Sequence, residues 1–329
     1  MLWLYAPEIN PADLSKNQTR VGACFQVENE EYIICFDGRC GDAASRVVNR
    51  LNKRKKRKIL FVSHPHYDHI NGVEKDIDKY GDAEWLICPD PASYNKDYSS
   101  EAKGNVEVLE RVIKKAKAKK IAVVYASDGD KFSFGDISFT VYRDQPNSAR
   151  NTETYINQGS LCVWFSNIRL LYTADTGTYC AKKHGLKPLI VTGMHHGNWL
   201  EKEGWQYLKL IGCKYYWDDD YSTTTTDFLS TGRGNAFKAG MTVFNLHGDL
   251  NILAFNGKAN IYKDGKVYSY ACSYDGELTL KGATLEMVKR VLNGTAGSSN
   301  ARVTYLIERG YNPGSVQGWV NTFYKLIKG

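Results

Sequence analysis

The sequence feature that most constrains the fold is a cluster of three histidines and an aspartate directly after a short apolar run. Ile59 to Val62 form the run, and Ser63-His-Pro-His-Tyr-Asp-His69 follows at once. The run predicts a buried strand, and crowded imidazoles and a carboxylate behind it are costly unless a cation compensates them. A histidine-rich surface loop is the alternative, but this spacing is far rarer than a lone histidine. The sequence therefore predicts a metal site at His64, His66, Asp68 and His69.

This motif resembles the signature of the metallo-β-lactamase superfamily of binuclear metallohydrolases. Three other segments match that signature in order over residues 20 to 270: a strand before Asp37-Gly38, a strand before Asp175, and a strand before His195-His196-Gly197. The resemblance implies that Asp175 bridges two metal ions and that Asp37 orients a ligand histidine without binding metal itself. It assigns the other ligands to the two ions, with His64 and His66 on one and Asp68, His69 and His195 on the other.

One departure from the signature concerns a histidine that many superfamily members carry between the first cluster and the bridging aspartate. No histidine stands between His69 and His184, and Asn157-Gln-Gly-Ser160-Leu161 occupies the corresponding place. This run resembles one subgroup, the hydrolase domain of the DNA-uptake protein ComEC and the phosphorylcholine esterases of teichoic acid. Asn157 and Ser160 are then expected beside the ligands. A mononuclear site stays open as an alternative.

Two residues of the predicted site are candidates for a direct part in catalysis. Asp68 is one candidate, in addition to its expected place as a metal ligand. His196, next to His195, is expected either to fill the vacant ligand position or to contact a substrate phosphate. Zinc suits the histidine-rich, thiolate-free ligands, and the same ligands accept manganese or iron. The resemblance implies two ions.

The order of predicted elements favours two packed sheets with helices outside, the αββα sandwich of the resembled superfamily. Composition and periodicity alone do not distinguish this fold from other α/β arrangements. Strands are expected at 22–27, 32–36, 59–62, 85–88, 121–125, 137–142, 160–165, 168–173, 188–192, 213–217, 241–244 and 260–268, and helices at 43–52, 106–119 and 201–210.

Near the C-terminus the strand-rich pattern gives way to short segments with helical spacing. This change predicts a hydrolase domain at 1–272, a linker at 273–284 and a three-helix module at 285–329. Helices are expected from Thr284, which can cap the first of them, at 301–308 and at 315–328. The spacing from Val291 to Asn321 resembles the cell-wall-binding repeat of phage lysins of the Cpl-seven type. The resemblance implies that this segment contacts the wall, although one copy is present and Ala296 stands where tryptophan is usual. A helical cap without a binding role is the alternative. The wall-contacting candidates are Arg302, Tyr311 and Gln317.

The formal net charge of +7 suggests an anionic partner, but much of the positive charge is local. Residues 53–58 are six consecutive cations before the predicted metal-site strand. They form either a phosphate-contacting patch near the site or a solvated loop, and the second interpretation is favoured. The lysines of 114–120 alternate with apolar residues at helical spacing, which is typical of the exposed face of an amphipathic helix.

Composition limits where such a protein is expected to act. The chain has no apolar run long enough for a membrane span, and its N-terminus lacks the pattern of a secretory signal. The eight cysteines show no paired spacing and predict small buried side chains rather than disulfides. We therefore expect a protein without membrane association that stays in the cytoplasm, or that leaves through a lysin-type release and acts outside the cell.

Together these features predict a metal-dependent phosphodiesterase or phosphoesterase acting on a bacterial cell-wall polymer, such as teichoic acid, its phosphorylcholine decoration or a peptidoglycan fragment. A nuclease of the DNA-uptake type, with nucleic acid as substrate, is the first alternative. A wall-binding protein with little catalytic activity is the second. Tyr67, Trp199, Tyr216, Trp217 and Tyr221 suit an aromatic cage for a quaternary ammonium group, but ordinary half-buried aromatics are the favoured interpretation.

Overall fold

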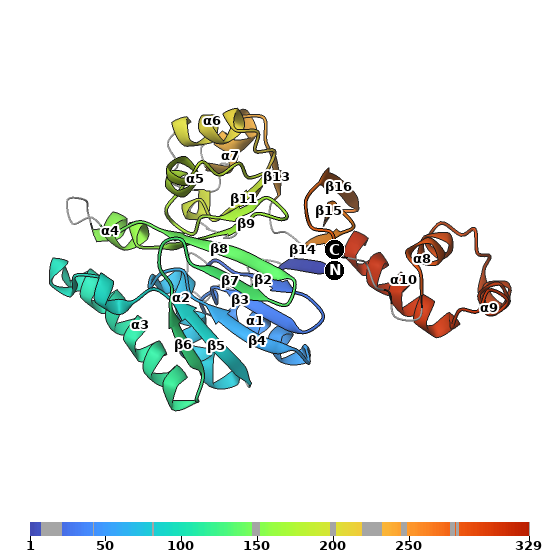
Figure 1. The fold of residues 1–329 in the computed structure, drawn as a ribbon, viewed down its shortest axis with the longest axis horizontal. Coiled ribbons are helices and arrows are strands. Elements are labelled where there is room, and N and C mark those ends of the chain that lie inside the picture. Colours follow the sequence, from blue (N-terminus) through green and yellow to red (C-terminus); the bar gives the residue numbers. More distant parts are fainter. Residues whose placement is uncertain are drawn as a thin grey trace.

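The chain builds two β-sheets that pack face to face (Figure 1). The computed structural model describes residues 1–7, 22–41, 43–80, 82–146, 152–197, 202–218, 232–244, 249–276, 280 and 283–328. Within these residues the first sheet has the order β16 (Lys266–Ala271), β15 (Lys258–Lys263), β14 (Leu250–Phe255), β1 (Leu2–Ala6), β2 (Phe25–Glu28), β3 (Tyr32–Phe36), β4 (Arg57–Phe61), β5 (Ala83–Cys88) and β6 (Ala122–Tyr125).

The second sheet contains the strands from the middle of the chain. Its order is β13 (Thr242–Phe244), β12 (Tyr215–Trp217), β11 (Ile190–Thr192), β10 (Leu170–Tyr172), β9 (Leu161–Phe165), β8 (Ile137–Arg143) and β7 (Lys131–Phe134). The inner faces of the two sheets are lined by aromatic side chains that contact one another across the interface, among them Phe25, Phe36, Phe165 and Tyr172. This aromatic layer is the main core.

Helices cover the outer face of each sheet. On the first sheet these are α1 (Ala43–Lys53), α2 (Tyr67–Asp76) and α3 (Ser100–Ala118), and on the second α5 (Tyr179–His184), α6 (Lys202–Leu210) and α7 (Gly232–Lys238). The predicted αββα sandwich is therefore confirmed, and Figure 1 shows its four layers from bottom to top. The lysines of 114–120 lie at the end of α3, whose apolar side packs on the sheet, as predicted.

The site depends on two groups of parallel strands. In the first sheet β3, β4, β5 and β6 run parallel, and in the second β10, β11, β12 and β13 do so. The carboxyl ends of parallel strands meet at one edge of a sheet, and residues that follow them come together there. The predicted ligands follow β4, β10 and β11.

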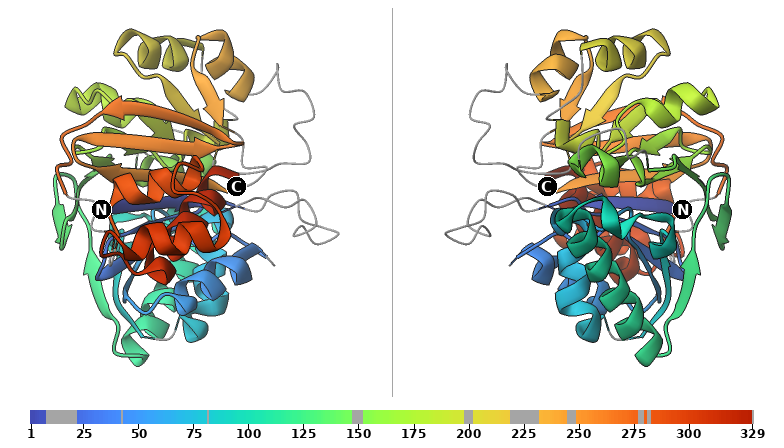
Figure 2. Two further views of the ribbon diagram at one scale, coloured as in Figure 1. Left: turned by 90° about the vertical axis from the view of Figure 1, so that its right-hand side faces the viewer. Right: turned by 90° about the vertical axis from the view of Figure 1, so that its left-hand side faces the viewer.

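Three C-terminal helices, α8 (Leu285–Leu292), α9 (Ser299–Ile307) and α10 (Pro313–Lys328), lie at one end of the molecule (Figures 1 and 2). Thr284 caps α8 as predicted, because its side chain accepts a hydrogen bond from Met287 N. The helices share a core with the outer face of β14 and β15, in which Val288 and Val316 join Leu253. The predicted helices are confirmed, and the domain boundary stays a prediction.

Several elements differ from those expected. The segment expected as one strand at 260–268 is the hairpin of β15 and β16, turning at Asp264 and Gly265, which both have positive φ. The strands β1, β7 and β14 and the helices α2, α4 (Thr152–Gln158), α5 and α7 were not expected. Among the described residues no helix has the length and apolar character to cross a membrane. All eight cysteines are free thiols, and seven are buried, as predicted.

Candidate metal centre

The histidine cluster spans a loop and the start of a helix. His64 and His66 lie in the loop after β4, and α2 begins at Tyr67, so that Asp68 and His69 stand on its first turn. The helix can approach the loop after β3 because both sides use glycine: a Cβ at Gly72 would lie 2.0 Å from the carbonyl oxygen of Gly38. This packing brings Asp37, at the end of β3, beneath the histidines.

The second sheet contributes the remaining ligand candidates. Asp175 follows β10, and His195 and His196 lie in the short 3-10 helix His195–Gly197 after β11. Met194, His195 and His196 all have φ between 52° and 55°, a left-handed conformation that is costly for three successive non-glycine residues. This backbone directs two adjacent imidazoles to different sides of Asp175.

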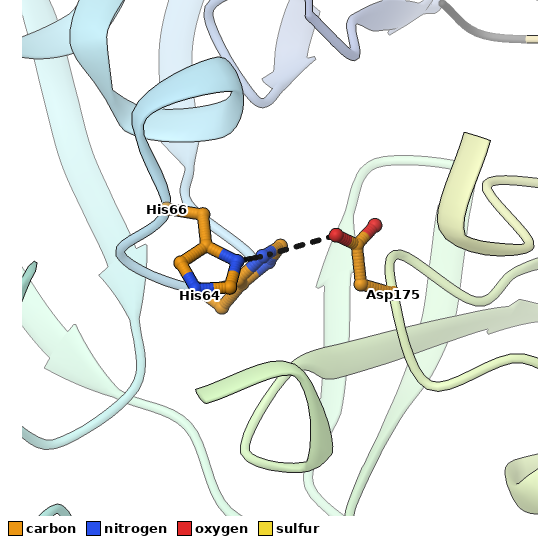
Figure 3. A group of neighbouring side chains, drawn as sticks. All are labelled: His64, His66 and Asp175. Carbon is orange, nitrogen blue, oxygen red and sulfur yellow. Dashed lines mark hydrogen bonds and ion pairs between the residues drawn. The ribbon is translucent and has the colours of Figure 1, made fainter. Parts of the chain in front are cut away.

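The first group of possible ligands consists of His64, His66 and Asp175. His64 Nε2 lies 3.2 Å from His66 Nδ1 and 3.4 Å from Asp175 Oδ2. Figure 3 shows both rings pointing from the loop after β4 toward the carboxylate on the opposite sheet. The three side chains can therefore hold one metal ion between the sheets.

The second group consists of Asp68, His69 and His196. His196 Nε2 lies 3.2 Å from both His69 Nε2 and Asp68 Oδ2. Asp175 reaches this group with its other oxygen, since Oδ1 lies 3.3 Å from His69 Nε2. Asp175 therefore faces the first group through Oδ2 and the second through Oδ1, which is the arrangement a bridging ligand requires.

The separations between these atoms fit a metal ion. Ligand atoms on a tetrahedron with bonds of about 2.0 to 2.2 Å lie about 3.3 to 3.6 Å apart. Within the two groups, neighbouring ligand atoms are separated by 3.2 to 3.4 Å. The donors are imidazole nitrogens and carboxylate oxygens, which bind divalent cations. Both groups can hold metal ions.

The protein's own charges act differently on the imidazoles of the two groups. Burial, together with the charge of His69, lowers the pKa of His64, and burial lowers that of His66 to about 3. Burial also disfavours the charged ring of His69, but the carboxylates of Asp175 and Asp37 outweigh it and raise the pKa well above its ordinary value. The imidazoles of the first group are thus neutral at pH 7, whereas His69 holds a proton that a metal ion must displace.

The carboxylates of the site stay ionised. Burial alone would raise the pKa of Asp68, but the hydrogen bond and charge of His196 hold it well below its ordinary value. The same holds for Asp175, where His69 and His196 outweigh the effect of burial on the pKa. Both oxygens of Asp175 are therefore available to cations at neutral pH.

The two adjacent histidines have exchanged the places assigned from the sequence. His195 was expected to complete the second group, but His196 lies there, because the left-handed turn directs its ring to Asp68 and His69. His195 lies instead on the first group's side, with Nε2 3.8 Å from Asp175 Oδ2. Its side chain is 14% exposed, whereas that of His196 is 2% exposed. His195 therefore stands at the solvent side of the site.

Two of the residues expected around the ligands, Asp37 and Asn157, contact histidines of the site. Asp37 Oδ2 lies 2.7 Å from His69 Nδ1 and so orients that ring from behind. Asn157 Nδ2 lies 3.4 Å from His195 Nε2. Ser160 is fully buried, and its hydroxyl has no hydrogen-bond partner among the described residues. The sequence interpretation did not include Ser63 and Tyr172, both of which contact Asp37.

The cationic run at 53–58 lies at the other end of β4 from the histidines. Glu28, which is 1% exposed, forms ion pairs with Arg50, Arg54 and Lys56. Arg57 pairs with Glu31 and Glu84, and Lys58 pairs with Asp82. The run is therefore neither a phosphate-binding patch beside the metal centre nor a simply solvated loop. Carboxylates of the same sheet edge neutralise most of it.

The remaining candidates fall into two sets. Tyr216 and Trp217 are buried in the second sheet and do not form an aromatic cage, which was the less favoured interpretation. Tyr67 is exposed, and Trp199 and Tyr221 lie outside the described residues. In the C-terminal helices, Arg302 Nη1 donates to Gln317 Oε1 at 2.9 Å and so links α9 to α10. Tyr311 lies next to the cap of α8, with its hydroxyl 3.3 Å from Thr284 Oγ1.

No protein-family model matches this chain, and no curated protein matches it. Among solved structures the chain is similar to a metallo-β-lactamase fold protein, YhfI from Bacillus subtilis, with 11% identity and a TM-score of 0.49 over 74% of this chain and 95% of that one. It is also similar to a mutant of the CmlA β-hydroxylase, with 13% identity and a TM-score of 0.42 over 75% and 55% of the two chains. A metallo-β-lactamase from Pontibacter korlensis shows 12% identity and a TM-score of 0.31 over 53% and 66%. The roles of the site residues therefore rest on the geometry of this chain.

Proposed function

We propose that this chain is a metal-dependent hydrolase with two metal positions bridged by Asp175. The observation that carries the proposal is the geometry of that carboxylate, whose two oxygens face two separate groups of ligand atoms. Zinc is the proposed metal because the ligands are imidazoles and carboxylates without a thiolate, and manganese or iron would fit the same atoms. The missing middle histidine does not remove the first position, since His64, His66 and Asp175 still converge there.

Two cations at these positions would supply an activated water and neutralise negative charge that develops on a substrate. The protein's own residues prepare the site for that chemistry. Asp68 is held ionised beside His196 within the second group. His195, at the more exposed side of the site, accepts a hydrogen bond from Asn157 and is placed to contact a substrate beside the first group.

The substrate class we propose is a phosphoester. It rests on the sequence resemblance at Asn157 to Leu161 and on the paired histidines, which are typical of a subgroup that cleaves such bonds. The geometry agrees with it, because a two-metal site suits attack on phosphorus and the imidazole of His195 lies at its more exposed side. The natural substrate would be a bacterial wall polymer such as a teichoic acid or its phosphorylcholine decoration.

The proposed wall specificity depends on the three C-terminal helices. Their sequence resembles a lysin wall-binding repeat, and Arg302 and Gln317 form a hydrogen-bonded pair between α9 and α10. We propose that this pair and Tyr311 contact the wall, and that the protein acts there after release from the cell. Cosedimentation with isolated walls tests this, comparing the full chain with Tyr311→Ala and, as a surface control, Lys289→Ala. Equal sedimentation of all three would contradict it.

The decisive test compares purified protein with His66→Ala and Asp175→Ala on bis(p-nitrophenyl) phosphate, isolated walls and DNA. We expect phosphodiester cleavage and release of phosphoester from walls by the wild type, bound metal near two equivalents, and loss of both in the variants. Cleavage of DNA but not walls would support a nuclease instead. Wall binding with less than one equivalent of metal and no cleavage would support a catalytically weak binding protein.

A further inference from the structure

The carboxylate of Asp37 is the meeting point of four hydrogen bonds behind the metal centre. It is fully buried and follows β3 in a left-handed conformation, with φ 56°. Its Oδ1 accepts from Ser63 N at 2.7 Å, and its Oδ2 accepts from Ser63 Oγ at 2.7 Å and from the Tyr172 hydroxyl. The fourth donor is His69 Nδ1, at 2.7 Å. Burial of a carboxylate is costly unless hydrogen bonds compensate it. The native fold therefore holds these four donors in place around Asp37.

The hydrogen bond from His69 Nδ1 to Asp37 sets the orientation of the His69 ring. Because Nδ1 donates to Asp37, Nε2 is the atom that points into the second group. It lies 3.3 Å from Asp175 Oδ1. A histidine that donates its outer nitrogen to a carboxylate is held in one orientation and one tautomer for metal binding.

A second path runs from the same carboxylate through Ser63 to His64. The Ser63 hydroxyl donates its proton to Asp37, so its oxygen can only accept from His64 Nδ1, which lies 3.0 Å away. His64 Nδ1 therefore carries a proton, and Nε2 faces Asp175 Oδ2 at 3.4 Å. Both paths start at Asp37 and end at opposite oxygens of Asp175.

Tyr172 joins the second sheet to this arrangement. It is the last residue of β10, it is 1% exposed, and its ring packs edge-on against Phe25 of the first sheet, with ring centroids 5.1 Å apart. Its hydroxyl donates to Asp37 across the sheet interface. Asp175 follows three residues later, so this bond ties the strand that presents the bridging ligand to the group that orients the histidines.

We infer that Ser63 and Tyr172 are positioning residues that act through Asp37, so that one carboxylate prepares both metal positions. Ser63 sets the tautomer of His64 and hence the first position. Tyr172 fixes Asp37 relative to β10 and hence affects both positions. The inference rests on the proposed metal site, but it does not depend on the proposed substrate.

Zinc titration of the full chain against a competing chelator tests this inference, with metal content measured by mass spectrometry. Ser63→Ala should weaken one of the two ions by about 10- to 100-fold and the other less, as expected for loss of a residue that orients a ligand. Ser63→Thr keeps the hydroxyl and should restore affinity. Tyr172→Phe should weaken both ions, by about 10-fold. Tyr80→Phe is the matched control, because that hydroxyl is also fully buried and has no partner among the described residues.

Imidazole ¹⁵N resonances of the metal-free protein give a readout that a merely structural role would not move. In the wild type and Ser63→Thr, His64 should show a protonated Nδ1, and in Ser63→Ala a mixture of tautomers. Wild-type zinc affinity and an unchanged His64 tautomer in Ser63→Ala would overturn the inference, as would equal effects of Tyr172→Phe and Tyr80→Phe. A chain that binds two ions with this pattern but cleaves no phosphoester would overturn the proposed substrate class alone.

Discussion

The two ends of β4 carry two segments rich in ionisable side chains, and they use charge in opposite ways. At the amino end, the cations of 53–58 are matched by Glu28, Glu31, Asp82 and Glu84 in ion pairs. At the carboxyl end, the side chains of His64 to His69 converge with Asp175 to form two groups of ligand atoms that can bind metal ions. These ends are about 16 Å apart, the length of a five-residue strand.

This difference shows that a conspicuous run of charge in a sequence does not by itself mark a binding site. Glu28 is buried and forms ion pairs with three cations, so the amino end contributes to stability. The site at the carboxyl end of β4 costs stability, because His195 and His196, which follow β11 and complete it from the other sheet, take a left-handed backbone conformation. Substitutions at the two ends of β4 should therefore have different effects. Those at the carboxyl end should lower activity, and those at the amino end should lower stability.

The largest effect is expected from removing the bridging carboxylate. Asp175→Ala should lower the rate of phosphodiester cleavage by more than about 1,000-fold, which corresponds to about 4 kcal/mol of transition-state stabilisation, and should reduce bound metal. Steady-state kinetics and metal analysis check this. His184→Ala is the control, since His184 stacks on Tyr142 and pairs with Asp128 away from the site. An active Asp175→Ala variant with full metal content would contradict the site.

A stability effect without loss of activity is expected at the amino end. Glu28→Gln leaves Arg50, Arg54 and Lys56 without their common partner, which should lower the free energy of unfolding by about 2 to 3 kcal/mol. This is below the value for a fully buried pair because the cations keep part of their hydration. Urea unfolding measures it. If cleavage by the folded variant fell more than the stability loss explains, the separation of the two ends would be wrong.

Metal affinity should depend on pH, and the dependence should differ between the two positions. The pKa of His69 is raised, so its proton must leave before an ion binds, and affinity of the second group should fall about tenfold for each pH unit below that pKa. The pKa values of His64 and His66 are lowered, so the first group should lose affinity only in more acidic solution. Zinc titrations between pH 8 and pH 5 test this. Equal pH dependence of both ions would contradict it.

The smallest effect is expected from the exposed lysines of the cationic run. Lys53→Gln with Lys55→Gln should change cleavage of a wall polymer or of DNA by less than about twofold, because the run lies at the wrong end of β4 to contact substrate. Rates measured at increasing salt provide the comparison. A steep salt dependence of the cleavage rate that disappears in the double variant would show that this run contacts the substrate.

Much of the site could be predicted because its ligands follow strands that the sequence marks clearly. The run before His64 and the strands before Asp37 and Asp175 are apolar and end sharply. The assignment of His195 and His196 could not be predicted, since a left-handed turn decides which ring faces which group. Other features depend on long-range packing and leave no local pattern.

Ser63 and Tyr172 are examples of such long-range features. Tyr172 and Asp37 are 135 residues apart in the sequence, so their hydrogen bond forms only when the two sheets pack together. Similarly, β1 pairs with β14, so that Trp3 lies opposite Leu253, a pairing that no nearby sequence signal indicates. The order of elements was compatible with the αββα arrangement, which the resemblance implied, while the pairing of β1 with β14 in the first sheet could not be predicted.

The supply of ligands by both sheets has a consequence for folding. The first sheet provides His64 to His69, and the second provides Asp175 and His196, so an ion bound between them connects two halves that meet only in the native state. The unfolded chain cannot assemble these atoms, so free metal shifts the equilibrium toward the closed sandwich by about 4 kcal/mol at a thousand times its dissociation constant. Metal supply would then decide how much of the protein persists as well as how much of it is active.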